Sequence, residues 1–240
     1  MSVNIMPKIN NILTNGCSFS CGPVGWPYPL QKKLDCNLIN LAVSASGNRY
    51  IHDSTIRELS KRQYDYVFIM WSGLQRNDIQ VDNIEIFNDA VNSRNQSGEN
   101  DWKDKIVYPV NDQDLIEKNW VFVALDNPFL KRTRFCEYIK YRGFKIEVQD
   151  SLMYMITLQS VLKQLNIPYV FSFYMDYLET LKTNKELFAM LDLNNICLDG
   201  NINEIAREIN SYNGDGFHPG VEANQIWADN LIKFINAETE

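Results

Sequence analysis

The sequence lacks the apolar segments that direct proteins into or across membranes. Its apolar runs are all too short to span a bilayer, and residues 1–11 have no apolar core like that of a signal peptide. Internal repeats and low-complexity segments are also absent, which excludes solenoid and fibrous proteins. We therefore expect a globular protein of the cytoplasm.

Paired cysteines and an excess of basic residues are also missing. The five cysteines are odd in number and do not have the paired spacing of metal ligands, so we expect reduced thiols and no metal site. The formal net charge of −7, from 23 Lys and Arg against 30 Asp and Glu, argues against a nucleic-acid partner. Nothing in the sequence calls for a cofactor.

Short apolar runs and amphipathic segments alternate along the 240 residues, 45% of which are hydrophobic. The apolar runs predict strands over residues 12–15, 38–43, 64–71 and 168–174, with an edge strand at 196–198. The amphipathic segments predict helices over 26–34, 49–61, 152–165, 202–209 and 221–235, and Asp150-Ser151 is typical of a helix cap. This order predicts a single α/β domain over residues 1–240, with a parallel sheet of about five strands and helices on both faces.

Residues 79–127 interrupt this alternation. The segment is acidic and rich in Asn, carries scattered aromatic residues and has no clear period. We interpret it as an insertion that caps the functional edge of the sheet, where it would contribute to substrate specificity. Its aromatic residues are suited equally to stacking on a substrate and to forming a small core of their own.

The end of the first predicted strand carries small polar side chains. Ile12 and Leu13 lead into Asn15 and Gly16, and Cys17, Ser18 and Ser20 follow directly. Ligands of open α/β sheets bind at the carboxyl ends of the strands, so these side chains lie where chemistry is usually done.

A second motif lies near the C-terminus, in a loop that is bounded by Gly and Pro. Asp215 precedes His218 by three residues, a spacing that lets the carboxylate orient one ring nitrogen while the other faces a nucleophile. The chain has only one other histidine, His52, which we interpret as a solvated or packing residue of the second predicted helix. Asp215 and His218 are therefore the candidate orienting group and general base.

Together, the Gly-Cys-Ser run at residues 16–18 and the Asp-x-x-His-Pro run at 215–219 resemble the first and last blocks of the SGNH (GDSL-type) hydrolases. The resemblance implies a three-layer, flavodoxin-like fold and a Ser-His-Asp triad of Ser18, His218 and Asp215. The first block differs from the family's Gly-Asp-Ser because Cys17 occupies the middle position, but the family's serine still falls on Ser18.

The resemblance also implies an oxyanion hole. The family's second block is a glycine that follows strand two, and it corresponds to Gly47, whose N–H would act together with the N–H of Ser18. The third block, Gly-x-Asn-Asp, is matched imperfectly after Gly73. Strict counting puts Gln75 in place of the asparagine, whereas Asn77 preserves the Asn-Asp pair.

Two further residues near the end of the third strand are candidates for binding substrate. Arg76 is suited to stabilising negative charge or to holding a carboxylate or phosphate, and Trp71 ends the strand itself.

The sequence thus predicts a serine esterase or acyl-hydrolase that acts on a small-molecule or glycan ester, such as an O-acetyl group. The choice of a glycan acetyl group rests on analogy with the family. Two alternatives stay open. Cys17 is a second candidate nucleophile, and the imperfect third block is compatible with a catalytically degenerate SGNH-like module for binding or assembly. The sequence leaves the oligomeric state undetermined.

Overall fold

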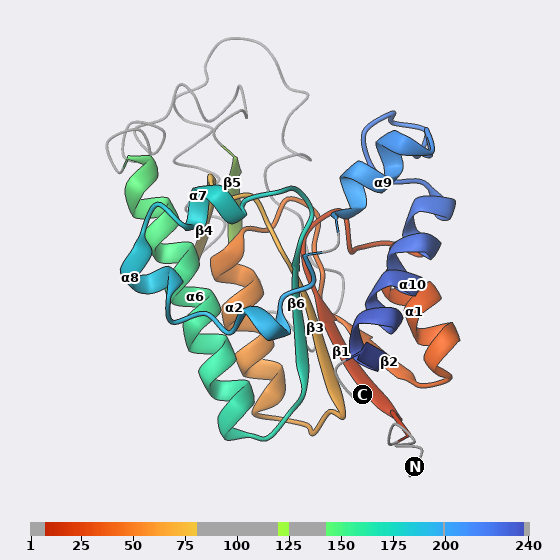
Figure 1. The fold of residues 1–240 in the computed structure, drawn as a ribbon, viewed down its shortest axis with the longest axis horizontal. Helices are drawn as coiled ribbons and strands as arrows, with labels where there is room; N and C mark the ends of the chain where they lie inside the picture. The colour runs from red at the N-terminus through yellow and green to blue at the C-terminus, as the bar shows by residue number, and fades with distance from the viewer. Residues whose placement is uncertain (1–7, 81–119, 125–142, 199, 238–240) are drawn as a thin grey trace.

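Four parallel strands form the central sheet of the computed structural model, which describes residues 8–80, 120–124, 143–198 and 200–237 (Figure 1). Their order is β2-β1-β3-β6. The strands are β1 (Asn11–Asn15), β2 (Asn37–Asn40), β3 (Tyr66–Trp71) and β6 (Tyr169–Phe173). From β1 the chain builds first to one side and then to the other. The carboxyl ends of β1 and β3 therefore form the topological switch point, where open α/β sheets bind ligands.

Helices cover both faces of this sheet, which gives the three-layer α/β architecture expected from the sequence (Figure 1). On one face lie α1 (Pro27–Leu34) and α10 (Val221–Ala237), and on the other lie α2 (Asn48–Leu59) and α6 (Phe144–Gln164). The shorter α9 (Ile202–Glu208) packs beside α10. Three short elements follow β6 along the chain: α7 (Leu178–Leu181), α8 (Lys185–Phe188) and the 3-10 helix η2 (Leu193–Asn195).

All six residues of β3 are buried, as expected for a parallel strand that is covered on both sides. Side chains alternate across a strand, so Val67, Ile69 and Trp71 join the core beneath α2 and α6. Phe68 and Met70 join the core beneath α1 and α10. The burial of each such side chain stabilises the folded state by roughly 1.5–3 kcal/mol. Because β3 supplies side chains to both cores, it is central to each of them.

The fifth strand predicted at residues 196–198 is reduced to one parallel bridge. Ile196 pairs with Phe171 of β6, and the Cys197 N–H donates to the Phe171 carbonyl oxygen at 2.8 Å. The described sheet therefore has four strands, with this bridge beyond the edge strand β6.

The helix that was expected to begin at residue 152 begins earlier in the structure. This helix, α6, begins at Phe144, and Gly143 at its N-cap has a φ of 74°, a conformation that glycine adopts at little cost. Asp150 and Ser151 lie inside the helix, and the Ser151 hydroxyl accepts a hydrogen bond from Asn48 Nδ2 at 3.0 Å. The predicted cap at Asp150-Ser151 is wrong because the helix begins six residues before Asp150.

Two antiparallel strands overlap the segment over residues 79–127 that was predicted as an insertion: the first runs into its start and the second lies within it. They are β4 (Arg76–Gln80) and β5 (Trp120–Ala124), and their register pairs Arg76 with Ala124. Residues 81–119 and 125–127 lie outside the described residues, so the cap over 79–127 stays a prediction. The assignment of the whole chain to one domain stays a prediction as well.

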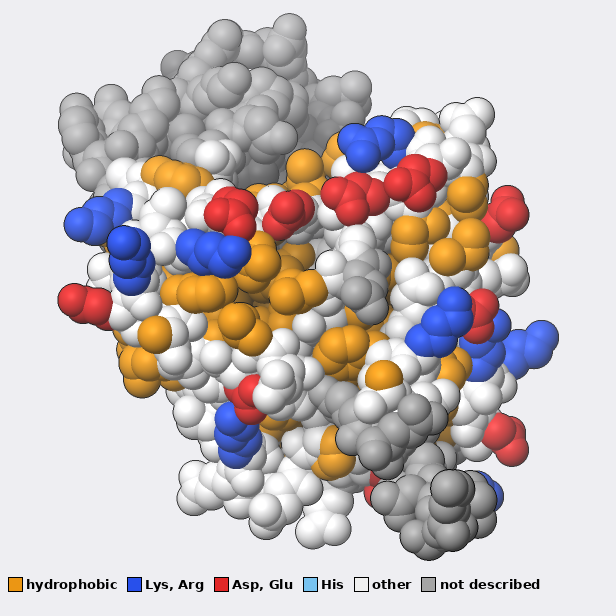
Figure 2. Space-filling view, in the orientation of Figure 1, with side chains coloured by type: hydrophobic (Ala, Val, Ile, Leu, Met, Phe, Trp, Pro, Cys, Tyr) orange, Lys and Arg blue, Asp and Glu red, His pale blue; other side chains and the backbone are white. Residues whose placement is uncertain are grey.

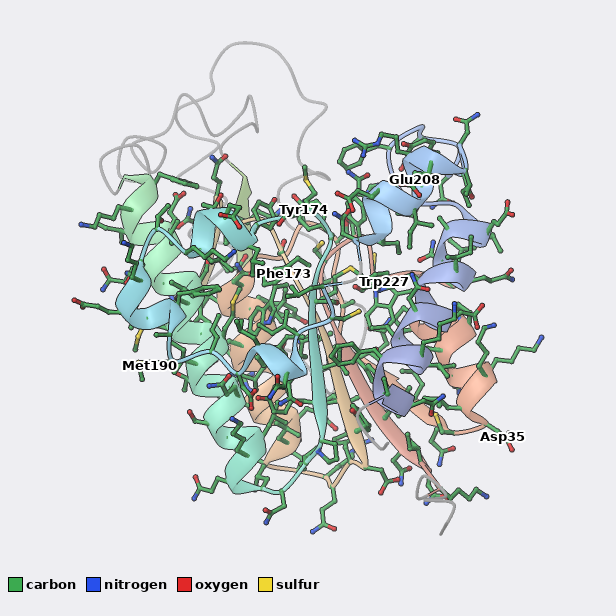
Figure 3. The ribbon with its side chains drawn as sticks, viewed as in Figure 1. Asp35, Phe173, Tyr174, Met190, Glu208 and Trp227 are labelled. Atoms are coloured by element: carbon green, nitrogen blue, oxygen red, sulfur yellow. The ribbon has the colours of Figure 1, made fainter. Side chains whose placement is uncertain are left out.

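None of the helices in the described ranges combines the length and apolar character needed to cross a membrane. Acidic and basic side chains are interspersed on the described part of the face in Figure 2. Apolar side chains are also exposed, among them Met190, which is labelled in Figure 3 and is 57% exposed.

A substitution at Gly16, directly after β1, tests how tightly the carboxyl end of the sheet is packed. A Cβ built on Gly16 would lie 2.3 Å from Ser20 Oγ, and that hydroxyl is held by a hydrogen bond from Trp26 Nε1 at 2.9 Å. We expect Gly16→Ala to lower the free energy of unfolding in urea by about 1–3 kcal/mol. Gly214→Ala is the matched control. No described atom lies within 4 Å of its added methyl group, so the expected change is below about 0.5 kcal/mol. Equal effects of the two substitutions would contradict this account.

Candidate active site

Ser18 lies in a helical turn directly after β1. The N–H groups of Ser20 and Cys21 both donate to the Cys17 carbonyl oxygen, at 2.9 and 3.2 Å. Cys17 and Ser20 are completely buried, and the Ser20 hydroxyl accepts from Trp26, whereas Ser18 is partly exposed. Ser18 is therefore the one of these three side chains that a substrate can reach.

Cys17 does not have the exposure that a nucleophile needs. Its side chain is 0% exposed and belongs to the core beneath α1 and α10. Attack on a substrate requires access as well as a thiolate. The structure therefore gives no support to the alternative in which Cys17 replaces Ser18.

Asp215 and His218 form the hydrogen-bonded pair predicted from their spacing. His218 Nδ1 lies 2.5 Å from Asp215 Oδ2, and Asp215 Oδ1 accepts from the N–H groups of Phe217 and His218, each at 2.9 Å. The Phe217 N–H, followed by the His218 ring and N–H, holds the pKa of the Asp215 carboxyl well below its usual range. Asp215 thus stays ionised and fixes the orientation of the imidazole.

The turn after β1 and the C-terminal loop meet through aromatic packing. The Phe19 ring lies 5.2 Å from the His218 ring and 5.6 Å from the Phe217 ring, measured between centroids. It also lies 4.6 Å from Tyr174, which Figure 3 labels beyond the carboxyl end of β6. The residue next to Ser18 therefore packs against the candidate general base, although the two are 199 positions apart in the chain.

Backbone pairing holds the Asp215–His218 loop closed. Tyr212 and Pro219 form an isolated antiparallel bridge, and the Asn213 N–H donates to the His218 carbonyl oxygen at 2.8 Å. The Gly220 N–H then donates to the Ser211 carbonyl oxygen at 2.8 Å, just before α10 begins.

Gly47 lies at the N-cap of α2, but its N–H already has a partner. It donates to Asp78 Oδ1 at 2.8 Å, and the Tyr50 N–H donates to Asp78 Oδ2 at 2.8 Å. The carboxylate of Asp78 thus caps the helix from another part of the chain, an arrangement that suits the partial positive charge at a helix N-terminus. The expectation that the Gly47 N–H faces an oxyanion is not supported, because this bond uses the donor.

The two candidate amides of the third block lie in different places. Asn77 Nδ2 donates to Glu147 Oε1 on α6 at 3.2 Å, and both side chains line a polar cavity of about 180 Å³. Gln75 is exposed and lines a different cavity, together with Arg76. The two amides therefore line different cavities, and Arg76 lines both of them.

Arg76 lies between the loops that follow β1, β2 and β3. Its Nη1 donates to the Ser46 carbonyl oxygen at 3.3 Å and to Ser72 Oγ at 3.1 Å. Its guanidinium lies 5.8 Å from the centre of the Tyr174 ring, within range of a cation–π contact. Burial lowers the pKa of Arg76, but Cys17, Tyr174 and Tyr177 outweigh it and raise the pKa overall. Arg76 therefore keeps its positive charge at the switch point.

A cavity of about 400 Å³ opens in front of Arg76. Its walls are mainly aromatic and apolar, with Gln75, Arg76 and Thr180 as polar groups. The lining residues are Ala45, Gly73, Leu74, Gln75, Arg76, Phe144, Tyr174, Tyr177, Thr180 and Phe217. Apolar walls with a few convergent polar groups are typical of a small-molecule site.

Trp71 and His52 lie away from this cavity. Trp71 is 0% exposed and packs edge-on against Phe171 in the core, so its predicted role in substrate binding is not supported. His52 Nδ1 contacts Asp53 Oδ1 at 2.7 Å, and its ring lies 5.3 Å from the Tyr154 ring of α6.

Sequence reasoning missed three residues of this region. Asp78 was seen only as half of the Asn-Asp pair, and neither Tyr174 nor Tyr177 was singled out. The available signal for the two tyrosines was their place at the functional edge of the sheet, since Tyr174 ends the predicted fourth strand and Tyr177 follows it. Within the described ranges, no three His, Cys, Asp or Glu side chains converge as metal ligands would.

The parallel sheet, its order and the site at its switch point define a three-layer α/β protein of the flavodoxin-like type. Comparison with solved structures identifies the fold as that of the SGNH hydrolases. The psychrotrophic esterase EstA from Pseudoalteromonas sp. is 14% identical, with a TM-score of 0.50 over 95% of this chain and 97% of EstA. TesA is 11% identical, with a TM-score of 0.51 over 95% of this chain and 99% of TesA. No family model and no curated protein matches the sequence.

Asp78 gives the site a pH-dependent stability. Burial raises its carboxyl pKa to about 7, despite the opposing hydrogen bonds from Tyr50 and Gly47. In the unfolded chain the pKa is about 4, so between these values the folded state binds more protons. The free energy of unfolding therefore falls as pH rises from about 4 to about 7, by at most about 1.4 kcal/mol per pH unit.

The measurement is urea unfolding of the wild type and Asp78→Asn at several pH values from 4 to 8. We expect the wild type to lose stability relative to Asp78→Asn as pH rises to about 7, and the difference to level off above it. Parallel stability curves over this range would contradict the raised pKa.

Proposed function

We propose that this protein is a serine ester hydrolase with Ser18 as nucleophile, His218 as general base and Asp215 as the group that orients it. One observation carries the proposal. The hydrogen-bonded Asp215–His218 pair packs on Phe19, the residue next to the partly exposed Ser18, at the switch point of the sheet. The general ester-hydrolase activity also agrees with the fold, because EstA is an esterase.

In the first half of the reaction, Ser18 Oγ attacks the ester carbonyl carbon and His218 takes the hydroxyl proton. The carbonyl π electrons move onto the oxygen, which becomes the oxyanion. When the oxyanion collapses, the bond to the leaving alcohol breaks, and that alcohol receives the proton from His218. An acyl-serine and a free alcohol result.

In the second half, water replaces the alcohol. His218 takes a proton from the attacking water and returns it to Ser18 Oγ when the acyl–oxygen bond breaks. The products are the carboxylic acid and the free enzyme. Asp215 stays ionised throughout, because its hydrogen bonds hold its pKa low, and it stabilises the imidazolium form of His218.

Small esters are the substrate class that we propose. A cavity of about 400 Å³ is near the lower end of ligand-site volumes, and its aromatic walls suit a short acyl group or a sugar ring. An O-acetyl group on a glycan or another small alcohol fits this description. The predicted cap at residues 79–127 would then restrict access further.

A catalytically degenerate binding module is the second candidate function. The observation that favours it is the loss of two expected oxyanion donors, because the Gly47 N–H is bound to Asp78 and the Asn77 amide is bound to Glu147. Retention of Ser18 together with the Asp215–His218 pair argues against it.

Hydrolysis of p-nitrophenyl acetate and butyrate tests the triad. We expect Ser18→Ala and His218→Ala to lower kcat at least about 10³-fold, because each removes a group that moves electrons or protons in the reaction. Asp215→Asn should lower kcat by a smaller but still large factor, since it removes the charge that orients His218.

A fluorophosphonate probe supplies an independent readout, since it labels activated serines. Ser20→Ala is the matched control because it removes the other, buried serine of the same turn, and we expect labelling to persist there but to vanish in Ser18→Ala. Equal background rates in the wild type and all variants, with no labelling of Ser18, would reject the hydrolase and favour the binding module.

A further inference from the structure

An acyl-transfer site needs donors for the oxyanion, and the donors expected after strands β2 and β3 are engaged elsewhere. The Gly47 N–H donates to Asp78, and the Asn77 amide donates to Glu147 in a polar cavity that Arg76 also lines. Gln75 lines the cavity of about 400 Å³ together with Arg76 and Phe217, but it is an exposed and neutral side chain. A donor for the developing negative charge must therefore come from somewhere else.

Arg76 forms no salt bridge with any residue that the structure describes. Among the described residues, no carboxylate lies within 4.0 Å of its guanidinium, and the nearby Asp78 is bound to the N–H groups of Gly47 and Tyr50. A partly buried charge that lacks a counter-ion is costly in a folded protein. Such a charge is retained where an anion occupies the site during function.

The guanidinium is held in place while some of its donors remain available. Both of its hydrogen bonds to described oxygens come from Nη1, which contacts the Ser46 carbonyl and Ser72 Oγ. The N–H groups of Nε and Nη2 donate to no described oxygen. Because the group is anchored on one side and stacked near Tyr174, little rearrangement is needed when charge develops in front of it.

Arg76 is also close to the nucleophile's turn. The Cys17 thiol is one of the groups that raise the pKa of Arg76, and Cys17 directly precedes Ser18. It lines the same cavity as Phe217, the neighbour of His218. Of the two neighbours of Ser18, Cys17 thus influences the electrostatics of Arg76, and Phe19 packs against the His218 ring.

We infer that Arg76 is a catalytic residue of the proposed esterase, whose guanidinium, with the Ser18 N–H, binds the oxyanion in place of the asparagine of the third block. When Ser18 Oγ bonds to the carbonyl carbon, the carbonyl oxygen takes the electron pair, and Arg76 donates hydrogen bonds to it. When the oxyanion collapses, the pair returns to re-form the carbonyl. Arg76 neither gains nor loses a proton. This inference rests on the proposed function.

Steady-state kinetics of Arg76→Met and Arg76→Lys on p-nitrophenyl acetate provide the test. We expect Arg76→Met to lower kcat by about 10²–10³-fold with KM within about threefold of the wild type, because the lost interaction exists only in the transition state. Arg76→Lys keeps the charge but not the planar pair of donors, so its loss should be smaller. Arg207→Met, at an exposed position on α9, is the matched control and should retain full activity.

Chemical rescue separates a catalytic from a merely structural role. Millimolar guanidinium chloride should raise the kcat of Arg76→Ala at least tenfold above its value without the additive. Sodium chloride at the same concentration should not raise it. Thermal unfolding of each variant checks that the fold persists. A variant that is destabilised but not rescued would indicate a structural role and overturn the inference.

A neutral and an anionic ester distinguish the oxyanion from a charged group on the substrate. If Arg76→Met retains kcat on the neutral acetate and only raises KM for a p-nitrophenyl ester with a free carboxylate, Arg76 binds substrate in the ground state and the inference is wrong. That failure leaves the proposed function intact, provided that the wild type turns over and Ser18 is labelled. A wild type without turnover or labelling would reject the proposed function and the inference together.

Discussion

The Gly16 carbonyl oxygen joins the loops on which the whole site depends. It accepts hydrogen bonds from the Val43 N–H at 3.3 Å and from the Ser46 hydroxyl at 3.0 Å, and so ties the turn after β1 to the loop after β2. The Ser72 hydroxyl then donates to the Ser46 carbonyl oxygen at 2.7 Å, which brings in the loop after β3. Buried backbone carbonyl groups need hydrogen-bond donors, and here the neighbouring loops supply them. Three separate loops thereby become one rigid edge, and Ser18 and Arg76 both project from it.

At the same edge, the carboxylate of Asp78 stabilises the fold by engaging backbone N–H groups. Asp78 satisfies two N–H groups at the start of α2, and it is buried at a considerable electrostatic cost, as its raised pKa indicates. A Cβ on Gly47 would lie 2.7 Å from the Arg76 carbonyl oxygen, so only glycine allows this close approach. The cap thus stabilises the helix and fixes the loop, but it takes the Gly47 N–H away from any substrate.

If Ser18 is the nucleophile, as we propose, Arg76 offers a hydrogen-bond donor that replaces the engaged Gly47 N–H. A neutral amide and a guanidinium both donate hydrogen bonds, but the guanidinium adds a full charge whose effect grows in a partly buried site. The imperfect third block then reflects a change of donor and is compatible with activity. This view connects three features that are otherwise unrelated: the engaged Gly47 N–H, the Asn77 amide that faces α6, and the cation that lacks a carboxylate partner among the described residues.

The sequence by itself determined the alternation of strands and helices, because apolar runs and amphipathic periods are local properties of the chain. It also determined the Asp215–His218 pair, whose hydrogen bond spans only three residues, and it singled out Ser18 through its place after the first strand. Only the tertiary structure decided which hydrogen-bond donors remain available to a substrate. The bond that engages Gly47 comes from a residue 31 positions away, and the one that engages Asn77 from a residue 70 positions away. The start of α6, the reduction of the fifth strand to one bridge and the burial of Trp71 were likewise decided by packing between distant segments. Local patterns carry no information about such contacts, because they form only when the sheet brings the ends of its strands together.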